Sequence, residues 1–130
     1  MIPPERLIGM QYRLGADPEI HGKADCLSLS RHVVGSYGIK LPTATRAWYR
    51  RLKQGDYSIF IEELERWGAV IEQPRIGAIA LCKSDKGYGL GSYWKGGCLV
   101  FINQTALWRP VMALPIERFY FPLRHSFVMS

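Results

Sequence analysis

Cys26 is the residue of this chain with the clearest potential for chemistry. It stands where a glycine-bearing loop turns into an amphipathic helix, in the segment Ala24-Asp25-Cys26-Leu27. Unpaired backbone N–H groups and the helix dipole stabilise a thiolate at a helix N-terminus and so lower the pKa of the thiol. Asp25 acts the other way if it is close, and it can also cap the helix. These residues alone leave two interpretations open, a nucleophile and a buried structural cysteine.

A cysteine nucleophile needs a base within reach, and the base needs a group that orients it. His32 follows Cys26 by about 240° of helical rotation, so we expect it to point elsewhere. His21 precedes Cys26 in the loop and could fold back toward it, and His125 lies in a C-terminal segment whose path the sequence does not indicate. For both, a surface position is the alternative. Cys82 and Cys98 fall on predicted core strands, where cysteine acts as a small hydrophobe.

The composition describes one globular domain. The chain has 130 residues, of which 48% are hydrophobic, enough for a single core over residues 1–130. Its three cysteines have no C-x-x-C spacing, so we expect neither a disulfide framework, nor a metal site, nor a cofactor. The N-terminal segment lacks the apolar core of a signal peptide, and no apolar run is long enough to span a membrane.

Helices are predicted first and strands afterwards. The helical half covers about residues 4–68 and the strand-rich half about 69–125. Apolar spacing, caps and breakers predict helices at the N-terminus after Pro3-Pro4 and over 25–37, 44–53 (capped by Thr43) and 57–67, with Asp56 as a cap. Strands are predicted over 69–71, 76–82, 97–102, 106–113 and 118–121, with 83–96 as a loop or irregular hairpin. This order without alternation is typical of an α+β fold with an antiparallel sheet.

Several of these segments together resemble the NlpC family of cell-wall cysteine peptidases. The matching segments are Tyr12-Arg13-x-Gly15-Ala16, Asp25-Cys26-x-x-Leu29, Tyr37-Gly38-Ile39-x-Leu41-Pro42 and Pro74-x-x-Gly77-Ala78-Ile79-Ala80-Leu81. The resemblance implies a papain-like fold and cleavage of peptide bonds in peptidoglycan. It also implies that Cys26 occupies the nucleophile position and Tyr12 the position that stabilises the oxyanion. A short chain of this kind is most similar to the phage-tail branch of the family.

The sequence departs from the family where the base is expected. The family's histidine opens the strand after the glycine-acid-leucine strand, and Lys95-Gly96-Gly97-Cys98 is predicted to correspond to it. A lysine replaces imidazole as a base only when it is strongly desolvated. The orienting position falls near Leu107 or Trp108, with Asn103 and Gln104 not far away. Ser28 stands where the family has a glycine, and Ala78 where it has an acid.

Aromatic and basic residues suggest binding surfaces. Tyr93, Trp94 and Trp108 lie where the family's substrate groove would be, and aromatic residues often anchor protein interfaces. Ordinary packing over the sheet is the alternative. The net charge is +6, and Arg46, Arg50, Arg51 and Lys53 lie in one short segment. A solvated helix face explains that segment most simply, and charge alone is a weak indication of nucleic-acid binding.

The sequence therefore predicts a structural component of a phage tail or baseplate, built on an NlpC-type domain that has lost its catalytic histidine. Its expected partners are other tail or baseplate proteins in several copies per virion, with peptidoglycan as a further candidate. Nucleic acid is the least favoured partner, and no membrane span is expected. Such a chain would be assembled in the host cytoplasm and reside in the virion. The alternative is an active cysteine endopeptidase that cleaves peptidoglycan peptides during infection.

Overall fold

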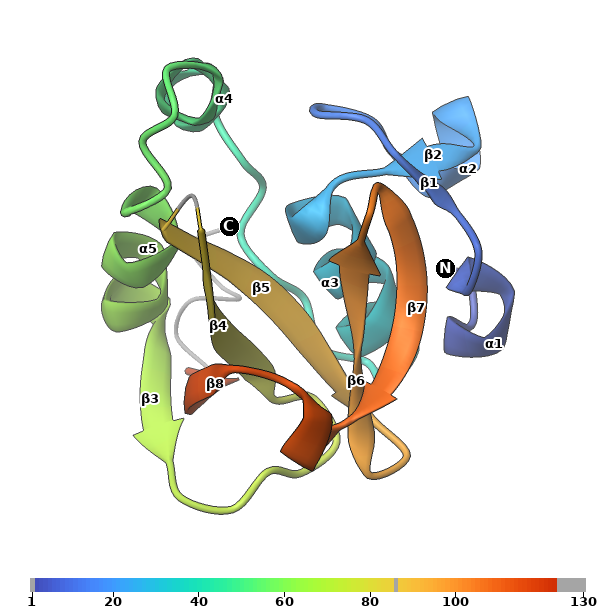
Figure 1. Cartoon of the computed structure of the whole chain (residues 1–130), viewed down its shortest axis with the longest axis vertical. Coiled ribbons are helices and arrows are strands. Elements are labelled where there is room, and N and C mark those ends of the chain that lie inside the picture. Colours follow the sequence, from blue (N-terminus) through green and yellow to red (C-terminus); the bar gives the residue numbers. More distant parts are fainter. Residues whose placement is uncertain (1, 86, 124–130) are drawn as a thin grey trace.

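The computed structural model describes residues 2–85 and 87–123 as a mixed fold of helices and strands (Figure 1). The helices are α1 Pro4–Leu7, α2 Pro18–His21, α3 Cys26–Gly35, α4 Arg46–Lys53, α5 Ile59–Trp67 and the 3₁₀ helix η1 Val111–Ala113. The strands are β1 Gln11–Tyr12, β2 Lys23–Ala24, β3 Gly68–Ile71, β4 Ile79–Ser84, β5 Gly87–Trp94, β6 Gly97–Ile102, β7 Thr105–Pro110 and β8 Ile116–Pro122. The predicted α+β class is confirmed. None of the described helices is long and apolar enough to cross a membrane.

The strands form one curled sheet in the order β2-β1-β7-β6-β5-β4-β8-β3. Strands β4 to β7 follow one another as an antiparallel meander, and β8 returns to pair between β4 and β3. The predicted antiparallel sheet is therefore present, with one exception at its edge, where β1 and β2 are parallel. In Figure 1, α3 lies against the sheet beside β5 and β6, while α5 lies beside β3 and β4.

The sheet opens between β5 and β6. β5 pairs with β4 along Gly87 to Ser92, but it pairs with β6 only from Ser92 to Trp94. Figure 1 shows the two strands diverging away from their shared hairpin. The first half of β5 therefore has one edge without a strand partner, and this edge faces the start of α3.

Residues 83–96, predicted as a loop or irregular hairpin, include the regular strand β5, which forms a hairpin with β4, so the loop alternative is wrong. Three alternate positions of this strand are glycines, which are depleted in strands and hid the pattern. At one of them, Gly91, an added Cβ would lie 2.9 Å from the Val100 side chain. Because Gly91 has no side chain, the Val100 side chain of β6 can lie close to the β5 backbone.

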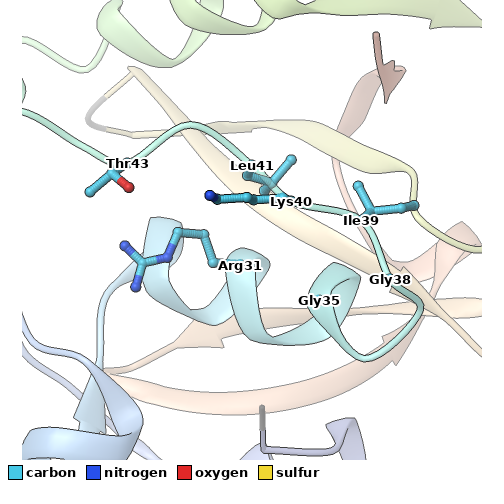
Figure 2. Close-up of a pocket in the computed structure, with 7 residues that line it drawn as sticks. All are labelled: Arg31, Gly35, Gly38, Ile39, Lys40, Leu41 and Thr43. Atoms are coloured by element: carbon cyan, nitrogen blue, oxygen red, sulfur yellow. The ribbon is translucent and has the colours of Figure 1, made fainter. Parts of the chain in front are cut away.

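Helix α3 begins where the sequence predicted and ends earlier. Asp25 caps it: its Oδ1 accepts a hydrogen bond from the Ser28 amide at 2.8 Å, and Ser28 Oγ accepts one from the Asp25 amide at 3.0 Å. The helix stops at Gly35, so Tyr37, predicted on the buried face, is 40% exposed. After it, the segment from Gly38 to Thr43 runs back alongside α3 (Figure 2).

Both sides of α3 are buried, whereas the sequence predicted one buried apolar face. Leu27 and Val34 pack into one apolar cluster with α4, α5 and the sheet, whereas Leu29 and Val33 pack into another below β6 and β7. Ser28 and Ser30, predicted on the outer face, are buried as well. The Ser30 hydroxyl is satisfied by the Ser92 hydroxyl of β5 at 2.9 Å.

The next two helices start two residues later than predicted. Thr45 rather than Thr43 caps α4, and Trp48 and Leu52 are its buried residues while Ala47 is exposed. Phe60, Leu64 and Trp67 line the buried face of α5 as predicted. Asp56 accepts a hydrogen bond from the Ser58 amide ahead of α5 but is not its N-cap residue.

Candidate functional site

Cys26, the first residue of α3, lines a pocket of about 330 Å³ at the opening between β5 and β6. The opposite walls come from Leu90 of β5, Val100 and Phe101 of β6, and Leu114 after η1. Cys26 is partly exposed and packs against an apolar cluster that includes Leu90, with Tyr57 and Tyr88 at its margin. Cys26 therefore lies at a pocket next to the part of β5 that has no β6 partner.

The Cys26 thiol is not activated. Its pKa is raised to about 11, chiefly by burial and also by the nearby Asp25 carboxylate. Hydrogen bonds from the Leu90 amide and from its own amide lower the pKa, but by less than burial raises it. At the start of this helix, desolvation outweighs the effect of the free backbone amides.

The structure brings Tyr12 and Cys26 together. Burial raises the pKa of the Tyr12 phenol, and the charges of Cys26 and then Asp25 raise it further, so the hydroxyl lies within their electrostatic reach. The Tyr12 ring is held edge-on against Phe101 of β6, with 5.1 Å between the ring centroids. The Tyr12 hydroxyl is thus within electrostatic reach of the sulfur, and its ring packs against Phe101, which lines the pocket.

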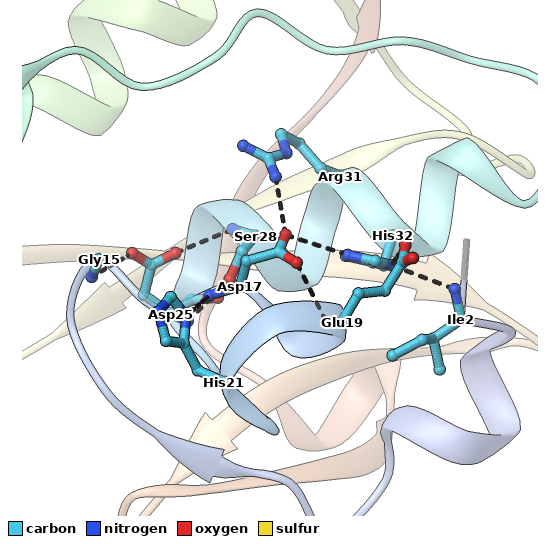
Figure 3. A network of polar contacts seen from close by, with 9 residues as sticks. All are labelled: Ile2, Gly15, Asp17, Glu19, His21, Asp25, Ser28, Arg31 and His32. Atoms are coloured by element: carbon cyan, nitrogen blue, oxygen red, sulfur yellow. Dashed lines mark hydrogen bonds and ion pairs between the residues drawn. The ribbon is translucent and has the colours of Figure 1, made fainter.

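The Asp25 side chain links the loop at Gly15 to the start of α3 (Figure 3). It is 3% exposed, and its second oxygen accepts a hydrogen bond from the Gly15 amide at 2.9 Å. The Tyr49 hydroxyl of α4 also interacts with this carboxylate. Burial raises the pKa of Tyr49 to about 12, and Asp25 contributes to that rise. With these partners, Asp25 has a structural role in the site.

The two described histidines belong to a separate network centred on Asp17 (Figure 3). His32 is buried, its Nδ1 accepts from the Ile2 amide at 3.2 Å, and its Nε2 lies 3.3 Å from Asp17 Oδ1. His21 Nδ1 accepts from the Asp17 amide at 2.9 Å. Neither histidine is among the groups that shift the pKa of Cys26. His32 points away from Cys26 as predicted, and His125 lies outside the described residues.

Lys95, predicted at the opening of the strand that follows β4, lies instead just past the end of that strand, β5. Lys95 lies in the β5–β6 turn, with its ammonium 4.7 Å from the centre of the Trp94 ring. It is five residues past Leu90, roughly 16 Å along an extended strand. The structure therefore does not place Lys95 beside the thiol.

The three aromatic residues predicted to form a binding surface lie on two faces of the sheet. Trp94 is 7% exposed, and the Trp108 Nε1–H donates to its carbonyl at 2.8 Å. Tyr93 points to the opposite face, edge-on to Phe119 with 6.1 Å between the ring centroids. Packing over the sheet therefore accounts for all three residues. Asn103 and Gln104 form the β6–β7 turn, where the Gln104 carbonyl accepts from the Tyr12 amide at 2.8 Å.

The sequence analysis missed the residues from distant parts of the chain that share the apolar cluster against which Cys26 packs. Tyr49 and Tyr57 come from the second half of the helical region, and Tyr88 and Leu90 from a strand that was predicted as a loop. No spacing signal could have linked them to Cys26, because each contact is made by tertiary packing. Within the described residues no cluster of histidine, cysteine or acidic side chains could hold a metal ion.

The pocket thus places a thiol with a raised pKa beside a strand edge that has no strand partner, and the Tyr12 hydroxyl lies within electrostatic reach of that thiol. Comparison of the chain with protein-family models and with curated proteins finds no match. Its interpretation depends on the geometry described above.

Proposed function

We propose that this chain is a structural component of a phage tail or baseplate, built on a papain-like, NlpC-type domain that acts through contacts with neighbouring proteins. The observation that carries the proposal is the environment of Cys26. The thiol lies within reach of the Leu90 amide and packs against an apolar cluster, neither described histidine acts on it, and its pKa is about 11. About one thiol in ten thousand is then ionised at pH 7. Since the thiolate is the nucleophile, this population supports a structural cysteine.

The proposed partners are other tail or baseplate proteins, and the proposed location is the virion. The resemblance to the phage-tail branch of the NlpC family supports both, through the segments around Tyr12, Cys26 and Gly77. Mass spectrometry of virions purified from the host that carries the gene would test the location. Several copies per virion are expected, and a chain confined to the host cell after lysis would contradict the proposal.

An active cysteine endopeptidase is the second candidate. It is favoured by the pocket itself, because Cys26 lines it and Tyr12 lies within electrostatic reach of the sulfur. The unpaired edge of β5 could bind an extended peptide by adding a strand to the sheet. This function requires a base for the thiol, and the described histidines are both engaged in the Asp17 network.

One assay separates the two candidates. The purified protein is incubated with peptidoglycan fragments, beside Cys26→Ala and beside Cys82→Ala, which removes the other thiol that lines the same pocket. The structural proposal predicts the same absence of cleavage products for all three proteins by mass spectrometry. Cleavage that is retained in Cys82→Ala and lost in Cys26→Ala would establish the peptidase instead.

A further inference from the structure

Helix α4 carries three cations on one solvent-facing side. Arg46, Arg50 and Lys53 are exposed, and with Tyr49 they line a hollow of about 300 Å³, here called the cationic hollow. Their spacing of four and three residues places them in one row, roughly 10 Å long, because each residue advances an α-helix by about 1.5 Å. Trp48 and Leu52 anchor the other side of the helix in the core.

These three cations have no acidic partner within the described part of the chain, unlike the fourth basic residue of the helix. Arg51 makes ion pairs with Asp56 at 2.8 Å and with Glu62. No carboxylate of the described residues lies within ion-pair distance of Arg46, Arg50 or Lys53. The first turn of α4 also holds no acid, so Arg46 stands unbalanced at the positive end of the helix dipole. An anion seated there would be stabilised by both charges.

A second, partly apolar groove lies next to the hollow. It has a volume of about 270 Å³ and runs between α3 and the segment that follows it, with Ile39 and Leu41 on one wall and Arg31 on the other (Figure 2). Figure 2 shows the Arg31 and Lys40 side chains pointing toward the Thr43 end of this groove. From Thr43 the chain reaches Arg46 within three residues, at most about 10 Å. The charge of Arg31 also acts on the Tyr49 phenol, which lines the hollow.

We propose that the groove and the cationic hollow together form a docking site for an acidic segment of another protein. Apolar side chains of the segment occupy the groove, and its carboxylates face the row of cations on α4. The inference rests on the proposed function, because it names the chemical class of the neighbouring protein that the domain contacts. Charge complementarity gives such a site its specificity and its fast association.

The same features disfavour two other occupants. Tyr49 is engaged with Asp25 through its hydroxyl, and Ile39 and Leu41 offer an apolar wall, so the site lacks the stacking platform of single-strand binding proteins. A second copy of the chain could not use the acids of α5, because they are engaged: Glu62 with Arg51, Glu63 with Arg66 and Glu65 with Arg118.

Fluorescence anisotropy with a labelled probe peptide tests the proposal. The probe has about twelve residues of alternating glutamate and leucine, enough to cover both parts of the site when extended. Its control replaces every glutamate with glutamine, and an oligothymidylate of about the same charge represents nucleic acid. The wild-type protein should bind the acidic probe, with affinity that falls when salt rises from roughly 50 mM to roughly 300 mM. It should bind neither of the other two.

The double variant R50E/K53E should weaken probe binding by about tenfold or more, while Arg109→Glu, an exposed cation on β7, should leave it unchanged. Both variants alter exposed side chains, and thermal unfolding confirms that each is folded. Lys40→Glu should also weaken binding, by a smaller factor, because Lys40 lines the groove.

Three outcomes would overturn the inference: no binding of the acidic probe, equal losses in R50E/K53E and Arg109→Glu, or tighter binding of the oligothymidylate. None of them bears on the peptidoglycan assay with Cys26→Ala. Failure of the docking site and failure of the proposed function are therefore distinguishable.

Discussion

The backbone amide of Leu90 in β5 lies within electrostatic reach of the Cys26 thiol at the start of α3. β5 pairs with β6 only from Ser92 to Trp94, so the earlier part of the strand, which includes Leu90, leaves one edge without a strand partner. The amide lowers the pKa of the thiol, as the helix N-terminus does, yet burial holds that pKa at about 11. The pocket thus positions a cysteine without activating it.

Asp25 is predicted to be the most important polar side chain for the stability of this region. Asp25→Ala removes the cap of α3 and the acceptor of the Gly15 amide, so we expect a loss of about 1–2 kcal/mol or more in the free energy of unfolding. Urea titration measures this loss. Asp85→Ala, at an exposed turn position, is the control and should change the value by less than about 0.5 kcal/mol. Equal effects of the two substitutions would contradict the role of the cap.

The sequence predicted this cap because its signal is local. A polar residue that follows a loop and precedes apolar residues at helical spacing indicates the start of a helix. The same holds for the strand over 97–102, which the structure confirms. Local patterns were enough for the α+β class and for the longer helices α3, α4 and α5.

The rest depends on contacts between distant residues. Ser30 was predicted on the surface, but it is buried because β5 supplies Ser92 as a partner, and β5 itself was hidden by its alternate glycines. Strands β1 and β2 have two residues each, too few to show any period. The contact between Tyr49 and Asp25 joins two helices through their packing, which spacing along the chain does not encode.

Gly97 is predicted to tolerate no side chain. A Cβ there would lie 2.2 Å from the Arg109 carbonyl oxygen and 2.6 Å from the Trp108 ring, both on the paired strand β7. Gly97→Ala should therefore destabilise the fold by about 1–3 kcal/mol, the usual effect of overpacking. Thermal unfolding of the variant would measure it. Gly89→Ala is the matched control, because a Cβ at Gly89 meets no atom within 4 Å. A smaller loss for Gly97→Ala than for this control would refute the close approach of β6 and β7.

Asp17 is predicted to make the fold sensitive to acid. Burial raises the pKa of its carboxyl, but hydrogen bonds from His32 and from the Glu19 amide, with the charge of Arg31, bring the pKa below the usual value on balance. A carboxyl whose pKa is lower when folded stabilises the protein above its unfolded pKa and loses that effect as pH falls through the folded pKa. The stability of the wild type should thus fall more steeply below about pH 4 than that of Asp17→Asn.

Urea titrations of both proteins at neutral and acidic pH would show this difference. Asp85→Asn, which removes an exposed carboxylate, should keep the wild-type slope. Parallel curves for wild type and Asp17→Asn would mean that the network around His32 does not hold the carboxylate.

The ionisation of Cys26 is the property on which the proposed function depends most. Alkylation of its thiol by iodoacetamide, followed by mass spectrometry of the peptide that contains it, gives the rate as a function of pH. In the Cys82→Ala/Cys98→Ala double variant, Cys26 is the one remaining cysteine, so the measured rate belongs to it. We predict a rate that keeps rising through pH 9 and 10, with a midpoint near the thiol pKa of about 11. A midpoint at or below about pH 7, typical of activated cysteines, would contradict a structural role for Cys26.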